Sequence, residues 1–175
     1  MTEAEIVRTR GCTIMKRRMK VQLTKSHRAY FKAAKAMSEL SEFKQYHIGA
    51  VAVCGHKIIS SGNNSNKTNP VQKRFNKHRF DAETRHTIHA ELACLLPLLN
   101  RKDINFSDVS LYIYREHKSG DLALARPCAS CEALIRSLGI RSIYYTGNQS
   151  YILPAAVGCP GPALPMKMTA SRSAP

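Results

Sequence analysis

The chain has 175 residues, and its 27 Lys and Arg against 12 Asp and Glu give a formal net charge of +15 and an isoelectric point near 9.9. This length suits one domain with its own core, and no apolar run approaches the ~20 residues of a membrane span. The basic N-terminus also lacks the apolar segment of a secretory signal. The sequence therefore predicts an intracellular protein, of cytoplasm or nucleus, that avoids membranes and is attracted to polyanions.

Three regions differ in composition. Residues 1–22 form a basic arm, residues 23–157 contain the periodic apolar segments of a folded domain, and residues 158–175 are a Pro-, Gly- and Ala-rich tail predicted to be disordered. In chain order, the domain is predicted to contain a helix from Thr24 or Ser26 to Phe43, strands at Ile48–Cys54 and Lys57–Ser61, a polar loop at Gly62–Arg85, a helix at Thr87–Leu99, a strand at Val109–Tyr114, a helix at Cys128–Leu138 closed by Gly139, and strands at Ile140–Thr146 and Tyr151–Val157.

Strands and helices that alternate in this way predict an α/β layer fold. The last two predicted strands are separated only by residues 147–150. A parallel crossover needs a dozen residues or more. These two strands are therefore predicted to form an antiparallel hairpin.

Two short segments supply soft metal ligands, namely His89-Ala90-Glu91 and Pro127-Cys128-Ala129-Ser130-Cys131. One imidazole and two thiols match the three protein ligands of a catalytic zinc site, which leaves a fourth position for water. The two thiols share one helix face, with Pro127 suited to the first helical position. His89 and Glu91 converge only near a helix start, which places Thr87 or His86 close to the cap. Glu91 is then available to move protons to and from that water.

Other readings of the cysteines remain open. A lone Cys-x-x-Cys also occurs in redox pairs and in structural zinc sites. A structural site needs a fourth protein ligand, for which His86, Cys94 and His117 are candidates.

The paired motifs resemble those of the zinc-dependent cytidine deaminase superfamily, whose signature is H-x-E…P-C-x-x-C. The resemblance covers about residues 23–157. It implies a three-layer α/β fold with a five-stranded mixed sheet flanked by helices, and one zinc per chain held by His89, Cys128 and Cys131. It also implies that Glu91 is the catalytic acid and base. The predicted antiparallel hairpin resembles the branch of the free cytidine deaminases and of toxin and viral deaminase-like proteins.

The resemblance also suggests substrate contacts. The Gly-x-Asn segment Gly62-Asn63-Asn64 makes Asn64 the candidate for holding the sugar, with Ala90 as a second contact, although Asn63 and Asn64 also suit a turn. Free cytidine deaminases carry a glutamate two residues later, where this chain has Asn66. That departure argues against a free nucleoside as the substrate.

A basic segment before His89 suggests the partner. It interleaves cations with aromatic side chains, as single-stranded nucleic acid sites do; its candidate contacts are Lys73, Arg74, Phe75, Lys77, Arg79 and Phe80.

The sequence slightly favours a deaminase of cytosine in single-stranded DNA or RNA. The alternatives are a deaminase of a free cytosine nucleotide or nucleoside, an adenine deaminase on RNA, and a nucleic-acid-binding protein with a structural zinc. A homo-oligomer is compatible with each of them.

Overall fold

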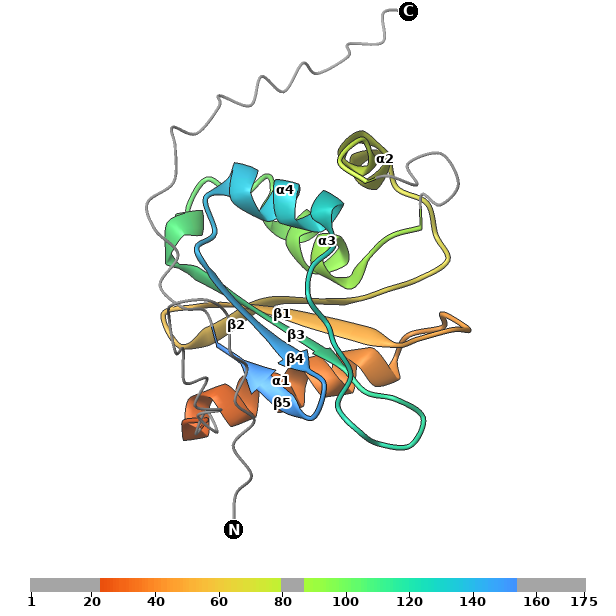
Figure 1. Cartoon of the computed structure of the whole chain (residues 1–175). Coiled ribbons are helices and arrows are strands. Elements are labelled where there is room, and N and C mark those ends of the chain that lie inside the picture. Colours follow the sequence, from red (N-terminus) through yellow and green to blue (C-terminus); the bar gives the residue numbers. More distant parts are fainter. Residues whose placement is uncertain (1–22, 80–86, 154–175) are drawn as a thin grey trace, which may run out of the picture.

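The computed structural model describes residues 23–79 and 87–153. Its helices are α1 (Lys25–Glu39), α2 (Pro70–Asn76), α3 (Ala90–Leu95) and α4 (Ala129–Leu138), with 3-10 turns at Leu96–Leu98 and Phe106–Asp108. Its strands are β1 (Ile48–Cys54), β2 (Lys57–Asn63), β3 (Val109–Arg115), β4 (Ser142–Gly147) and β5 (Ser150–Ile152). The sheet separates α1 on one face from α2, α3 and α4 on the other (Figure 1). None of the helices described is long and apolar enough to cross a membrane.

The five strands form one mixed sheet in the order β2-β1-β3-β4-β5. Strand β1 is antiparallel to both β2 and β3, while β3 and β4 are parallel. Strand β5 pairs antiparallel with β4, with Thr146 opposite Tyr151. The predicted fold class and the antiparallel last hairpin are confirmed. The predicted extension of this strand to Val157 runs beyond Leu153, the last described residue.

Two glycines allow helices to lie directly on the sheet. A Cβ added at Gly49 would lie 2.0 Å from the Ala34 carbonyl oxygen of α1. A Cβ at Gly62 would lie 2.3 Å from the Cys94 backbone nitrogen of α3, on the opposite face. Both contacts are with backbone, which no rotamer change relieves. Gly62 therefore sets how closely the helix after His89 approaches β2.

The core has one part on each face of the sheet. Leu92, Leu95 and Leu134 from the helices pack against Leu111 and Ile113 of β3, all almost fully buried. On the α1 face, Phe31 meets the Tyr112 ring edge-on, and Tyr112 stacks on Tyr144 at 4.4 Å between ring centroids. Side chains thus cover both faces of the sheet, and the N-terminal ends of α3 and α4 are where a site can form.

Several predicted boundaries are wrong for local reasons. The first helix ends at Glu39 rather than Phe43, because the Ser41 hydroxyl bonds the backbone and side-chain oxygens of Asn64, each at 2.8 Å. The helix predicted from Thr87 begins at Ala90, and it becomes a 3-10 turn at Leu96, where Pro97 follows. Pro127 precedes the Cys128 N-cap instead of occupying the first helical position.

The segment predicted as one polar loop, Gly62–Arg85, contains the helix α2. Its signal was present in the sequence, because Asn69 caps the helix through a 2.8 Å bond to the Val71 nitrogen and Pro70 follows it. Gly139 ends α4 in the left-handed conformation (φ 85°) as predicted.

Candidate active site

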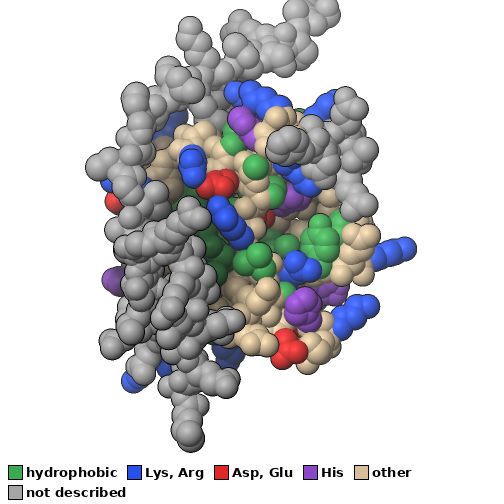
Figure 2. Space-filling model, viewed as in Figure 1, with side chains coloured by type: hydrophobic (Ala, Val, Ile, Leu, Met, Phe, Trp, Pro, Cys, Tyr) green, Lys and Arg blue, Asp and Glu red, His purple; other side chains and the backbone are tan. Residues whose placement is uncertain are grey.

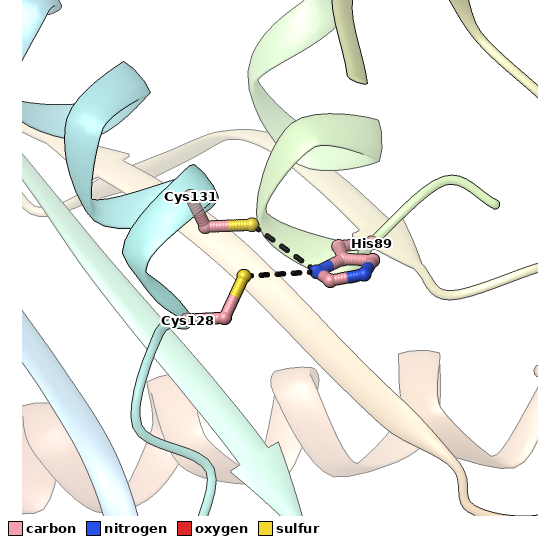
Figure 3. Close-up of side chains that lie close together, drawn as sticks. All are labelled: His89, Cys128 and Cys131. Atoms are coloured by element: carbon pink, nitrogen blue, oxygen red, sulfur yellow. Dashed lines mark hydrogen bonds between the residues drawn. The ribbon is translucent and has the colours of Figure 1, made fainter. Parts of the chain in front are cut away.

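Two helix N-termini bring three potential metal ligands together. His89 is the N-cap of α3, Cys128 is the N-cap of α4, and Cys131 lies in the first turn of α4. Their ligand atoms all lie within 4.8 Å of one another, and His89 Nδ1 is 3.4 Å from each sulfur (Figure 3). The imidazole therefore turns Nδ1 toward the thiols.

This cluster suits one zinc ion. An imidazole nitrogen and two thiolates are ligands that zinc prefers, and three protein ligands are typical of a catalytic site. Of the predicted fourth ligands, Cys94 and His117 do not join the cluster of described residues, and His86 lies outside the described residues. Cys94 is instead fully buried, and burial raises the pKa of its thiol to about 12. It behaves as a small core side chain.

The pKa values of the two thiols are shifted in opposite directions. A hydrogen bond from the Cys131 thiol lowers the pKa of Cys128 to about 4, and His89 adds to this effect. That same bond, with burial, raises the pKa of Cys131. This pairing favours the thiolate form of Cys128, which is the form that binds metal.

Glu91 lies beside the cluster, in the first turn of α3. Its side chain is 5% exposed, and burial raises the pKa of its carboxyl group. The carboxyl group also interacts with His89 and with the Cys131 thiol. A buried carboxyl group with a raised pKa next to metal ligands is suited to exchange protons with a substrate.

A buried amide network fixes both metal-bearing helix ends. Gln72 of α2 accepts a hydrogen bond from the His89 backbone nitrogen at 3.2 Å, and it donates to Asn76 at 3.0 Å and to Ser130 at 3.1 Å. Ser130 donates to Asn76 at 3.1 Å and lies between the two cysteines. Gln72 and Asn76 are 2% exposed. One side chain thus ties α2 to both ligand segments.

A cleft of about 310 Å³ opens next to the cluster, and His89, Ala90 and Cys128 line it. Asn64 lines it too, although its oxygen already accepts from Ser41 and from the Ile48 nitrogen, each at 2.8 Å, and its amide donates to Tyr46. Three of the four hydrogen-bonding positions of this amide are therefore occupied by the protein. The structure places both predicted substrate contacts, Asn64 and Ala90, in the cleft wall.

The predicted nucleic-acid contacts separate into two faces of α2. Lys73, Arg74 and Lys77 are exposed, whereas Phe75 is 9% exposed and packs into the core. In this arrangement the Phe75 ring faces the protein and is not exposed to a base. Arg79 lines the cleft, with one guanidinium nitrogen 3.4 Å from His89 Nε2. Phe80 lies outside the described residues.

Positive charge is widespread on the surface. Lys and Arg side chains are spread over the face seen in Figure 2, where Asp and Glu occupy few places. Two further arginines that the sequence analysis missed, Arg115 and Arg126, line the cleft itself. Arg126 directly precedes the motif that begins at Pro127, and this position could have identified it as a residue close to the metal ligands. Gln72 was missed because α2 was.

Comparisons with known proteins concern the family and the fold. Residues 24–147 match the family model of the cytidine and deoxycytidylate deaminase zinc-binding region. The fold matches that of a cytidine deaminase from Burkholderia pseudomallei with a TM-score of 0.50 and 20% identity, covering 74% of this chain and 92% of that one. A dCMP deaminase from the cyanophage S-TIM5 matches with a TM-score of 0.47 and 24% identity, covering 67% and 79%. No curated protein sequence matches the chain significantly.

Proposed function

The chain belongs to the cytidine and deoxycytidylate deaminase family, and we propose that it converts cytosine to uracil at the cluster of His89, Cys128 and Cys131, with Glu91 as the proton-transfer group. Membership of this family makes it a zinc-dependent hydrolytic deaminase. The observation that carries the assignment of roles is the buried Glu91 carboxyl group beside three convergent zinc ligands. A purely structural zinc has no use for such a group.

The residues suggest a division of labour. Zinc supplies Lewis acidity, which makes water nucleophilic near neutral pH. Glu91 takes a proton from the attacking water and delivers it to N3 of the cytosine ring as the oxygen bonds to C4. It then carries the remaining proton of that oxygen to the amine, which leaves as ammonia when the C4–N bond breaks. The burial of Glu91 supports this role, because it keeps the carboxyl group beside the metal ligands and away from bulk water.

The decisive test is Glu91→Gln in the full chain, which keeps the shape of the side chain and removes its proton exchange. General acid–base groups contribute about 10²–10⁴-fold, so turnover should fall at least that far. Zinc content and melting temperature should stay near those of the unaltered protein. Near-normal uracil formation by this variant would refute the role of Glu91.

The form of the substrate is the finer part of the proposal. We favour cytosine within single-stranded nucleic acid, because three exposed cations on and directly after α2 (Lys73, Arg74 and Lys77) lie a few residues before Arg79, which lines the cleft. A free cytosine nucleotide is the second candidate, which the cleft volume favours: about 310 Å³ is at the lower end of small-molecule sites. Incubation with single-stranded DNA, RNA, dCMP and cytidine, scored for uracil, discriminates between them.

A further inference from the structure

The cleft contains a cation whose hydrogen-bonding capacity is only partly used by the protein. Among the residues described, Arg115 Nε is the single buried side-chain nitrogen or oxygen without a hydrogen-bond partner. Its Nη1 makes only a long contact of 3.4 Å with the Leu124 carbonyl oxygen. The guanidinium group lies 5.1 Å from the centre of the Tyr46 ring, which holds its plane by a cation–π contact. The Arg115 guanidinium group is therefore held in one orientation, yet its Nε–H has no hydrogen-bond acceptor in the protein.

The backbone around this cation is firmly anchored. Arg115 is the last residue of β3, and both of its backbone polar groups are hydrogen-bonded. Its backbone nitrogen donates to the Thr146 hydroxyl at 3.1 Å, and its carbonyl oxygen accepts from the Ala123 nitrogen at 3.0 Å. The Ala125 nitrogen in turn donates to the Thr146 carbonyl oxygen at 2.8 Å. These bonds fix the segment that carries Arg126, an exposed cation at the rim of the same cleft.

The charge balance of the cleft points to an anion. Arg79, Arg115 and Arg126 line it, and no Asp or Glu of the described residues does. Within residues 23–79 and 87–153, the ion pairs found join other side chains, and none of them includes Arg115 or Arg126. A planar guanidinium fork with free N–H groups is matched by the tetrahedral oxygens of a phosphate, which it binds through two parallel bonds.

We propose that Arg115 and Arg126 form a phosphate subsite, so that the preferred substrate is a cytosine nucleotide unit carrying a phosphate and not the free nucleoside. The inference rests on the proposed function, because it assumes that the base lies against His89 and Cys128 in the same cleft. The phosphate belongs either to a free nucleotide or to a strand of nucleic acid. The same two arginines serve both sources.

The test measures binding separately from turnover. Zinc-loaded Glu91→Gln protein is titrated with cytidine, with cytidine 5′-monophosphate and with a single-stranded oligonucleotide containing one cytosine. The same titrations follow with Arg115→Gln, Arg115→Lys or Arg126→Gln added. Arg141→Gln is the matched control, because Arg141 is exposed and precedes β4, whose parallel pairing with β3 places it away from the Arg115 end. Deamination by the corresponding variants with Glu91 intact is measured in parallel.

Cytidine monophosphate should bind at least tenfold more tightly than cytidine. Arg115→Gln should weaken the phosphate-bearing ligand by about ten- to a hundredfold, the range expected for hydrogen bonds to charged groups, with cytidine affinity changed less than twofold. Arg115→Lys should retain part of the affinity, and Arg126→Gln, at the exposed rim, should show the same selectivity. A loss for the mononucleotide alone identifies a free nucleotide as the source, and a loss that includes the oligonucleotide identifies strand phosphate.

Equal affinity for cytidine and its monophosphate, or equal losses in Arg115→Gln and Arg141→Gln, would overturn the subsite. Its failure is distinguishable from that of the deaminase assignment. Deamination of cytidine and its monophosphate with equal efficiency removes the subsite and keeps the enzyme. Phosphate-selective binding without uracil formation from any substrate does the opposite.

Discussion

The part of the site around the ligands His89, Cys128 and Cys131 (the metal side) and the cleft wall with Arg115 and Arg126 (the substrate side) differ in one respect. They differ in how many of their buried polar groups have hydrogen-bond partners in the protein. On the metal side, the Gln72 side chain bonds Asn76, Ser130 and the His89 backbone. On the substrate side, the buried Arg115 Nε has no partner. The difference indicates that the fold fixes the metal ligands by itself, whereas the cleft keeps donors available for a ligand.

The two sides also differ in what holds them. The metal ligands sit at the ends of α3 and α4, two helices packed on the sheet through Leu92, Leu95 and Leu134. The substrate side is built from strand ends and from the segment between β3 and α4, which is held by hydrogen bonds such as Leu124 nitrogen to Asn148 Oδ1 at 3.1 Å and not by a packed helix. Changes on the metal side should therefore affect stability and activity together, and changes on the substrate side mainly affinity.

The largest effect is expected from Cys131→Ala. Loss of one of three ligands should abolish stoichiometric zinc binding and, with it, uracil formation. Stability should fall too, because binding energy at such sites contributes to folding; with zinc at about a thousandfold above its Kd, the loss is about 4 kcal/mol. Metal analysis and thermal unfolding of the purified protein measure both.

Cys94→Ala is the matched control for this change. Cys94 is as buried as Cys131, at 0% and 1% exposure, but it lies outside the ligand cluster. Its replacement by alanine should keep zinc and activity, with a cost of about 1 kcal/mol for the lost packing. Equal zinc contents in the two variants would contradict the ligand assignment.

The sequence was sufficient to predict the metal side, because its ligands are local in the chain and chemically distinctive. His89, Glu91, Cys128 and Cys131 were each recognised from a short motif, and the structure brings them together. The hairpin of β4 and β5 was likewise predictable from a connection too short for a crossover.

The substrate side was predicted poorly for a physical reason. Arg115 and Arg126 are defined as a pair only by the register of β3 with its neighbours and by the path of the following segment, neither of which a local pattern contains. Phe75 was grouped with the neighbouring cations as a candidate contact, but within α2 it lies on the face that packs into the core. Recognising Asn69-Pro70 as a helix start would have separated these faces.

An intermediate effect is expected from Gln72→Ala, which tests whether the network positions the metal side. Three partners would lose bonds in a buried region, at a cost of about 1–3 kcal/mol. Outer groups that orient metal ligands typically change metal affinity or activity by 10–100-fold. Zinc affinity should thus fall within that range, whereas exposed Gln45→Ala should leave it unchanged. Reduced stability with unaltered zinc affinity would limit Gln72 to a structural role.

The smallest effect on catalysis is expected from neutralising the exposed face of α2, with Lys73, Arg74 and Lys77 all changed to Gln. Each phosphate contact with a single strand contributes about −0.7 to the slope of log affinity against log salt. If all three cations touch phosphates, the slope should become less steep by about 2. Because these side chains point away from the core into which Phe75 packs, turnover of a free nucleotide should hardly change. Mobility shifts of a labelled oligonucleotide across a salt series measure the slope. An unchanged slope would show that these three cations do not contact the nucleic acid. The arginines of the cleft would then be the groups that select a phosphate-bearing substrate.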